Sequence, residues 1–180
     1  WNAQGRFCGW ADPPLNQAGV GEARQLAPLA QHLDVLLTSP LKRATQTAAA
    51  IGPADVDKGL KELNHGSLEG LTARQAQIDY RSLLRHWERD SAGVRFPNGE
   101  SLADCHRRIS TCLEGLARDL RPGSLIGAVT HQLAIATVIC KLEGLSFSEW
   151  RSRKVPNGSV TTVVCENGQW RLADYGWLPR

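Results

Sequence analysis

Hydrophobic residues recur along this chain at helical spacing in some stretches and at strand spacing in others. After Asn16, a residue type that caps helices, apolar residues follow at helical spacing, although Pro28 should kink or interrupt that helix. The apolar stretch Val35 to Leu37 predicts a short strand. Ser39 as N-cap and Pro40 at the first helical position then predict the start of another helix.

Helical spacing and strand spacing of the hydrophobic residues alternate through the rest of the chain. Helical spacing predicts a helix over residues 72–88 and another after Ser101, which with Asp104 resembles a capping box. The continuous apolar run at residues 125–130 is typical of a strand covered on both faces, and a helix over 133–142 is predicted to follow it.

Helices that alternate with apolar strands predict a three-layer α/β/α fold with a mostly parallel central sheet flanked by helices. The tail alternates on both sides of Asn167-Gly168, which predicts a C-terminal hairpin. No internal repeat or linker interrupts the pattern, and 180 residues suit one core. We therefore expect a single domain over residues 1–180.

The composition narrows the range of partners. The chain has 21 basic and 18 acidic residues scattered along it, a net charge of +3, so no nucleic-acid partner is expected. Five cysteines without a C-x-x-C pair predict neither a disulfide framework nor a metal site, and reduced thiols fit the cytoplasm. No apolar run approaches the roughly 20 residues of a membrane span. We expect a cytoplasmic protein without a membrane partner or a cofactor; the pattern indicates no oligomeric state.

Two residues suited to anion chemistry follow predicted strands. Arg43 comes after the strand at 35–37, and His131 comes after the run at 125–130. Because ligands of such sheets bind beyond the carboxyl ends of the strands, a phosphate there could meet the helix start and the Arg43 guanidinium together. The alternative for Arg43 is a surface arginine paired with a carboxylate, and for His131 a histidine with a satisfied hydrogen bond.

Five blocks of sequence carry a resemblance to a known family. "TSPLKRATQTA" resembles the S-x-L-x-R-A-x-Q-T signature of the histidine phosphatase (phosphoglycerate mutase-like) superfamily. "WNAQGRFCGWADPPLNQAG" is similar to the segment that follows the family's N-terminal motif, "KELNHGSLEG" to its acid loop, "PNGES" to its G-E-S turn and "AVTHQ" to its second-histidine motif. The blocks keep the family's order, and the resemblance implies the phosphoglycerate mutase-like fold and the cofactor-independent phosphatase branch.

The resemblance also implies roles for particular residues. Arg43 matches the arginine that binds the transferred phosphoryl group, Asn2 an asparagine that hydrogen-bonds it, and His131 the second active-site histidine. Glu62 matches the general acid, whose pKa should be raised toward neutrality. Glu69 is the nearby alternative, but the family pattern assigns it to the structural E-G pair at the end of the loop, so we favour Glu62.

Further residues match the substrate side of the family's pocket. Arg6, Cys8 and Gly9 lie where related proteins line the pocket, although Cys8 equally suits a small buried apolar position. Gln132 stands where many relatives have glycine and is expected to change how backbone amides meet the substrate. His65 has two open interpretations, a residue at the pocket mouth or an exposed loop histidine.

The family's nucleophile is the histidine of an R-H-G motif that ends its first strand, and no R-H-G occurs in the 180 residues. A missing first strand would leave unpaired backbone groups on both neighbouring strands, at about 1–3 kcal/mol for each buried group. The sequence also opens on Trp1 and contains no methionine. We therefore expect an upstream segment that carries this strand and the histidine.

The resemblance implies phosphomonoester hydrolysis of a small phosphorylated metabolite through a phosphohistidine intermediate, without a metal ion. The span from Gly70 to Pro97 is shorter than the insertion of the family's mutases, which favours a hydrolase. Two alternatives stay open: a catalytically inactive pseudophosphatase that binds phosphate esters, and a phosphoglycerate mutase-type phosphotransferase.

Overall fold

Three parallel strands form the central sheet. In the computed structural model, β1 (Val35–Thr38) lies between β2 (Asp55–Val56) and β3 (Ile126–Val129). Thr38 at the end of β1 is in register with Val129 at the end of β3. The residues that follow these two strands are therefore delivered to the same edge of the sheet.

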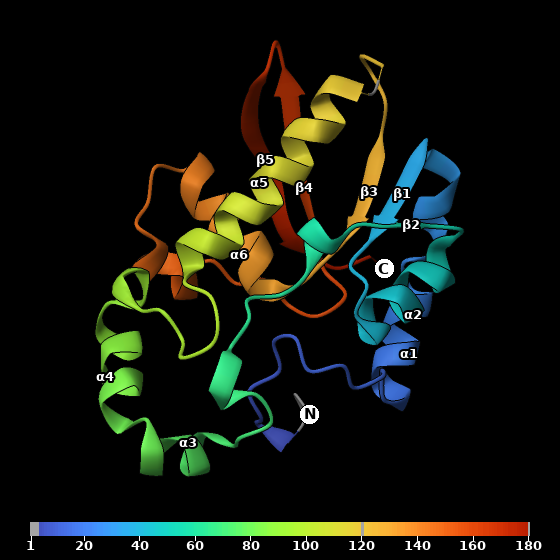
Figure 1. Cartoon of the computed structure of the whole chain (residues 1–180). Coiled ribbons are helices and arrows are strands. Elements are labelled where there is room, and N and C mark those ends of the chain that lie inside the picture. Colours follow the sequence, from blue (N-terminus) through green and yellow to red (C-terminus); the bar gives the residue numbers. More distant parts are fainter. Residues whose placement is uncertain (1–3, 120, 180) are drawn as a thin grey trace.

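Helices flank this sheet and form a cap beside it. The structure describes residues 4–119 and 121–179. Figure 1 shows α1 and α2 together on one side of the molecule, α5 and α6 together on the other, and α3 and α4 as a cap at the lower left. The bounds are α1 Gln17–Arg24, α2 Lys42–Ile51, α3 Ala73–Asp79, α4 Arg81–Arg89, α5 Leu102–Asp119 and α6 Gln132–Leu142. Short 3₁₀ helices lie at Ala27–His32, Lys58–Leu60, Gly66–Leu68, Ser91–Gly93 and Phe147–Ser152. The predicted α/β architecture is confirmed.

Side-chain caps fix the starts of several helices. Asn16 Oδ1 accepts the backbone N–H of Gly19 at the start of α1. At the start of α5, Asp104 accepts the N–H of Ser101 while the Ser101 hydroxyl accepts the N–H of Asp104, so the predicted capping box forms. Tyr80 separates α3 from α4, where the pattern predicted one continuous helix.

The start of α2 differs from the prediction. The helix begins at Lys42 with Leu41 as its N-cap residue, not at Pro40 with Ser39 as the cap. Ser39 Oγ still accepts the N–H of Leu41, but it also bonds the ring of His131. The Ser39 hydroxyl therefore joins two strand ends instead of closing a helix turn.

The C-terminal hairpin forms as predicted. β4 (Val160–Glu166) and β5 (Gln169–Trp177) pair antiparallel, and Glu166 faces Gln169 across a two-residue turn. Asn167 and Gly168 both have positive φ, 52° and 76°, as the favoured hairpin turn requires. The hairpin is a second sheet, separate from the parallel one.

A groove separates the two sheets. Among the described residues, β3 pairs only with β1 and β4 pairs only with β5, and the facing edges of β3 and β4 line one continuous cavity. β3 was predicted to be covered on both faces, but Ala128 is exposed and the other three residues are half-buried. The prediction of full cover was wrong because β3 forms one wall of this groove.

The main core lies between α5, α6 and the cap. Its most deeply buried side chains include Leu60, Leu63, Leu68, Phe96 and Leu102, each at most 1% exposed. Full burial of one such side chain stabilises the fold by about 1.5–3 kcal/mol. Within the described ranges, no helix combines the length and apolar character needed to cross a membrane.

Candidate active site

The paired ends of β1 and β3 bring Ser39 and His131 into contact. Ser39 follows β1, His131 precedes α6, and the ring Nε2 of His131 lies 2.9 Å from Ser39 Oγ. Both residues are buried. Burial, and then the charges of Arg43 and Arg108, hold the pKa of His131 well below its ordinary value. His131 is therefore a neutral imidazole at neutral pH.

Arg43 extends from the first turn of α2 toward the loop of residues 7–11. Its guanidinium donates to the carbonyl oxygens of Gly9 at 2.7 Å and Ala11 at 3.0 Å. The anion at the start of α2 is the chain's own Asp12, whose Oδ1 accepts the backbone N–H of Lys42 at 2.6 Å. The helix start is thus occupied by a carboxylate, while Arg43 itself lines the cavity.

Glu62 is buried against the first turn of α6. Its carboxyl accepts backbone N–H groups from Leu63 at 2.8 Å and from Leu133 and Ala134 at 3.2 Å. Desolvation by burial raises the pKa of Glu62 even though these donors and Arg43 act in the opposite direction. A carboxyl group with a raised pKa can hold a proton for transfer.

The three groups converge on one place. Arg43, Glu62 and His131 line the same cavity of about 1560 Å³, which also extends along the groove between β3 and β4. The positive charge of Arg43 lowers the pKa of both Glu62 and His131. Residues from three separate segments therefore form one site with a fixed cation, a neutral imidazole and a protonatable carboxyl.

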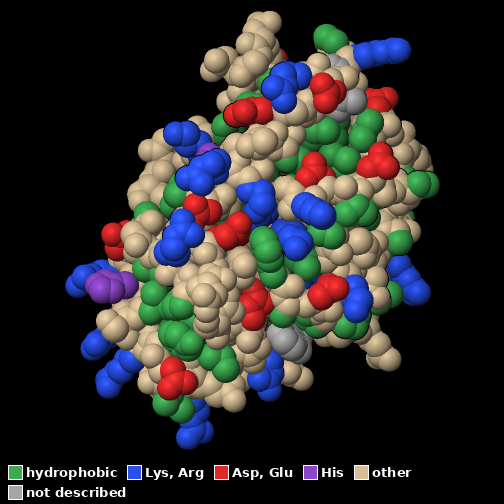
Figure 2. Space-filling model, viewed as in Figure 1, with side chains coloured by type: hydrophobic (Ala, Val, Ile, Leu, Met, Phe, Trp, Pro, Cys, Tyr) green, Lys and Arg blue, Asp and Glu red, His purple; other side chains and the backbone are tan. Residues whose placement is uncertain are grey.

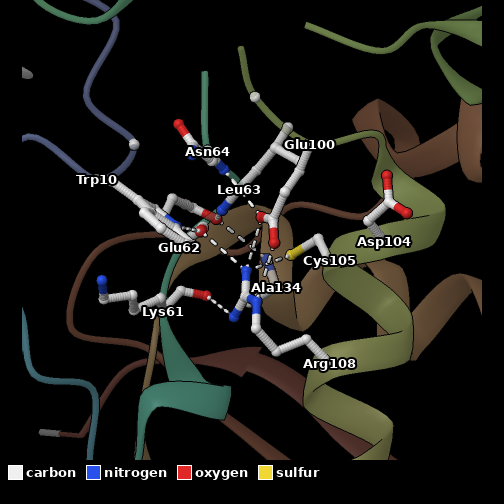
Figure 3. Close-up of polar contacts among 12 residues, drawn as sticks. Trp10, Lys61, Glu62, Leu63, Asn64, Glu100, Asp104, Cys105, Arg108 and Ala134 are labelled. Atoms are coloured by element: carbon white, nitrogen blue, oxygen red, sulfur yellow. Dashed lines mark hydrogen bonds and ion pairs between the residues drawn. The ribbon is translucent and has the colours of Figure 1, made fainter. Parts of the chain in front are cut away.

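An ion pair missed by the sequence reasoning holds the loop that carries Glu62. Arg108 of α5 binds Glu100 through two hydrogen bonds of 2.8 and 3.1 Å. The same guanidinium donates to the carbonyl oxygens of Gly59, Lys61 and Glu62. Figure 3 shows the Arg108 side chain reaching toward Glu100 and toward the loop that carries Lys61 and Glu62. No local signal in the sequence distinguishes Arg108 from the arginine beside it.

Glu69 has the structural role that the family pattern gave it. Its carboxylate accepts the N–H groups of Trp10, Ala11 and His65, so it joins the loop of residues 7–11 to its own loop. The indole N–H of Trp10 donates to the carbonyl oxygen of Glu62 at 2.8 Å. Both carboxylate oxygens of Glu69 are thus bonded by backbone donors.

The residues expected on the substrate side lie near this centre. Arg6, Cys8 and Gln132 line the cavity, and burial is the main cause that raises the pKa of the Cys8 thiol. Gly9 packs so closely that a β-carbon there would lie 2.2 Å from the carbonyl oxygen of Leu63. Asn2 lies outside the described residues.

The face of the molecule seen in Figure 2 carries charged side chains of both signs. Figure 2 shows Lys and Arg side chains gathered near the middle of the face in view, with acidic side chains between them. Among residues 4–119 and 121–179, no group of three or more His, Cys, Asp or Glu side chains is placed to hold a metal ion.

Comparisons with known proteins identify the family of this chain. Residues 1–178 match the family described as the histidine phosphatase superfamily (branch 1). Phosphoserine phosphatase 1 of Hydrogenobacter thermophilus is 31% identical over 173 residues, which cover 92% of this chain and 82% of that protein. A probable phosphoglycerate mutase GpmB of Escherichia coli O1:K1 / APEC is 30% identical over 185 residues, 99% of this chain and 85% of the relative.

A solved structure extends the likeness to the fold. The mycobacterial glucosyl-3-phosphoglycerate phosphatase in complex with VO3 is 25% identical and superposes with a TM-score of 0.86, covering 97% of this chain and 92% of that one. The sequence match over nearly the whole length and the shared fold have one explanation. The chain belongs to branch 1 of the histidine phosphatase superfamily and is a phosphatase of that family.

Proposed function

We propose that this protein hydrolyses the phosphomonoester bond of a small phosphorylated metabolite through a phosphohistidine intermediate. The convergence of Arg43, Glu62 and His131 on one cavity carries the proposal. The names of the relatives point the same way, because phosphoserine and glucosyl-3-phosphoglycerate are both small phosphate esters.

The chemistry has two steps. In the first, a histidine nitrogen bonds to phosphorus, the bond to the alcohol oxygen breaks, and Glu62 gives its proton to the leaving oxygen. In the second, water attacks phosphorus, Glu62 takes a proton from the water, and the P–N bond breaks to release inorganic phosphate. Arg43 and the neutral His131 bind the phosphoryl oxygens, where charge must be stabilised. Asn2 joins them in this proposal on the family resemblance alone.

The nucleophile requires one more segment. We propose that an extended segment occupies the groove between β3 and β4, pairs with both edges, and ends in the nucleophilic histidine beside His131. Apolar residues of both strands line the groove, among them Ile126 and Val163. Each facing edge has backbone groups that a further strand would pair.

Mapping the phosphorylated residue tests this assignment. The natural full-length protein is reacted with a phosphate ester, quenched under alkaline conditions that preserve phosphohistidine, digested and sequenced by mass spectrometry. The phosphoryl group is expected on a histidine outside these 180 residues. Phosphorylation of His32, His65, His86, His106 or His131 would overturn the assignment, and ester binding without any phosphoryl transfer would instead indicate a pseudophosphatase.

Replacing Arg43 tests the site itself. Arg43→Ala should lower kcat/KM for phosphate release by about 10²-fold or more, because a fixed cation at the phosphoryl group is lost. The matched control is Arg74→Ala, which removes an exposed arginine on α3 and should leave turnover unchanged. Near-normal turnover of the Arg43 variant would refute its role. Faster exchange of phosphate between phosphoglycerates than release to water would favour the mutase alternative.

A further inference from the structure

Ser39 is fully buried between the end of β1 and the start of α2, and the proposed mechanism gives it no task. Its backbone N–H donates to the carbonyl oxygen of Val129 at 2.9 Å, so the residue continues the pairing of β1 with β3. Its hydroxyl oxygen lies 2.9 Å from Nε2 of His131. The paired strands therefore hold this hydroxyl against the ring that the mechanism uses.

The partners of the Ser39 hydroxyl determine the direction of its bond to His131. Oγ accepts the backbone N–H of Leu41 at 3.3 Å, and this N–H has no other acceptor in the described part of the chain. The hydroxyl proton needs an acceptor of its own, because a buried donor without one is costly. Among the described residues, Nε2 of His131 is the acceptor within reach. Ser39 therefore donates and Nε2 accepts.

The opposite direction would leave a buried proton without an acceptor. If Nε2 carried a proton and donated it, Ser39 Oγ would accept from both Leu41 and His131, and its own proton would have no partner. The same conflict would arise with a protonated imidazole, which has an N–H on both nitrogens. Burial, and then the charges of Arg43 and Arg108, hold the pKa of His131 well below its ordinary value. The ring is thus neutral, with its one proton on Nδ1.

A proton on Nδ1 gives His131 a hydrogen-bond donor for a bound anion. Within residues 4–119 and 121–179, the bond to Ser39 is the one hydrogen bond of the ring, and the ring lines the cavity beside Arg43. A bare Nδ1 would present its lone pair to the lone pairs of a phosphoryl oxygen, whereas an N–H binds them. The tautomer therefore decides whether the ring repels or binds the phosphoryl group.

We propose that Ser39 is a positioning residue that fixes the tautomer of His131: its hydroxyl donates to Nε2, and the proton kept on Nδ1 is donated to a phosphoryl oxygen. The proposal rests on the proposed function for the identity of the ligand. The tautomer itself is a property of the protein without ligand. Ser39 acts through the ring and not by contact with the ester.

The protonation of each ring nitrogen can be measured directly. Long-range proton–nitrogen NMR correlation spectra of the natural full-length protein distinguish a neutral ring protonated on Nδ1, a neutral ring protonated on Nε2, and the cation. The signals of His131 are assigned by their absence from the His131→Phe variant. At neutral pH the wild-type ring should carry its proton on Nδ1. A proton on Nε2, or a cationic ring, would overturn the proposal and leave the proposed function standing.

Ser39→Ala removes the hydroxyl, and Thr38→Val is the matched control. Ser39→Ala should move the proton of His131 at least partly to Nε2, the nitrogen that a neutral histidine in water prefers. Calorimetric titration with vanadate should then show binding weakened by about tenfold. Thr38 is the preceding buried residue, and its hydroxyl donates to the carbonyl oxygen of Ser39 instead of the ring. Thr38→Val should therefore leave both the tautomer and the vanadate affinity as in the wild type.

A double-mutant cycle separates this role from a purely structural one. If Ser39 acts through the ring, Ser39→Ala should weaken vanadate binding by less than about twofold when His131 is already phenylalanine. Equal losses in both backgrounds, or an unchanged tautomer in Ser39→Ala, would refute the role of Ser39.

Two further outcomes keep this inference apart from the proposed function. If the wild-type protein binds no vanadate, the proposed function fails, and the bond from Nδ1 to a phosphoryl oxygen fails with it. Should Ser39→Ala not fold, the wild-type spectrum decides, because a proton on Nε2 would contradict a donating Ser39 hydroxyl and a proton on Nδ1 would support it.

Discussion

At the scale of single residues, burial determines which protonation states the site can use. Glu62 and His131 face the same Arg43, yet burial moves their pKa values in opposite directions because it disfavours whichever form is charged. The carboxyl is thereby able to carry a proton and the imidazole stays neutral. A carboxyl group that carries a proton suits proton transfer to a leaving oxygen. A neutral imidazole beside it suits hydrogen bonding to phosphoryl oxygens.

Glu62→Gln should affect substrates according to how much their leaving group needs a proton. For an alkyl phosphate, kcat/KM should fall by about 10²–10⁴-fold, since general acid catalysis of the first step is lost. For p-nitrophenyl phosphate, whose leaving group departs as a stable anion, the fall in the first step should be much smaller. Steady-state assays of both esters check this, with Glu88→Gln on the exposed face of α4 as the control. Equal losses in kcat/KM for both esters would contradict the acid role.

The buried histidines should make stability depend on pH. His65 has a pKa of about 4 when folded against 6.5 when unfolded, so between these values the unfolded chain binds more protons and stability rises with pH. The difference corresponds to roughly 3 kcal/mol gained from pH 4 to pH 7. His65→Phe should lose that part of the dependence, as measured by urea unfolding at both pH values. An unchanged pH dependence in the variant would mean that His65 is not buried in its neutral form.

At the scale of elements, the sequence predicted which segments are helices and strands better than it predicted how loops are held. Apolar spacing and capping residues located α1, α5, α6 and the hairpin, because these signals lie within a few residues of each other. The predicted N-cap of α2 was wrong, because Leu41 and not Ser39 holds that position. Ser39 instead bonds His131, which is 92 positions away, and no local pattern predicts such a bond. The bonds from Arg108 to the loop that carries Glu62 were not predicted either, because these residues also lie far apart in the sequence.

The bonds of Arg108 lead to a prediction about how α5 holds the loop that carries Glu62. Arg108→Ala would leave Glu100 half-buried without its partner and free the loop carbonyls, so the free energy of unfolding should fall by about 3 kcal/mol. Turnover should fall as well, because Glu62 is no longer held against α6. Urea unfolding and steady-state assays measure the two effects.

Arg107→Ala is the matched control for that variant. Arg107 is the neighbouring residue on α5, its side chain is exposed, and its partner Asp104 also pairs with Arg95, so loss of Arg107 should change stability by no more than about 0.5 kcal/mol. Equal effects of the two substitutions would show that Arg108 does not hold the loop.

At the scale of the whole molecule, the site depends on segments far apart in the chain that meet at one edge of a parallel sheet. The order of the sequence blocks was enough to predict that Arg43, Glu62 and His131 belong together, because each block follows or precedes a predicted element of a known fold. The groove could be anticipated from the absent R-H-G motif. Its effect on β3, which is only half-buried, became visible only in the structure.

The central claim is that Arg43, Glu62 and His131 serve a single phosphoryl group. A crystal structure of the natural full-length protein with vanadate, a mimic of the transferred phosphoryl group, tests it most directly. The account predicts one vanadate ion with oxygens within hydrogen-bond distance of the Arg43 guanidinium and the His131 ring, and with the Glu62 carboxyl facing the leaving-group position. A vanadate ion bound away from Arg43 and His131, or these two residues turned toward separate ions, would contradict it.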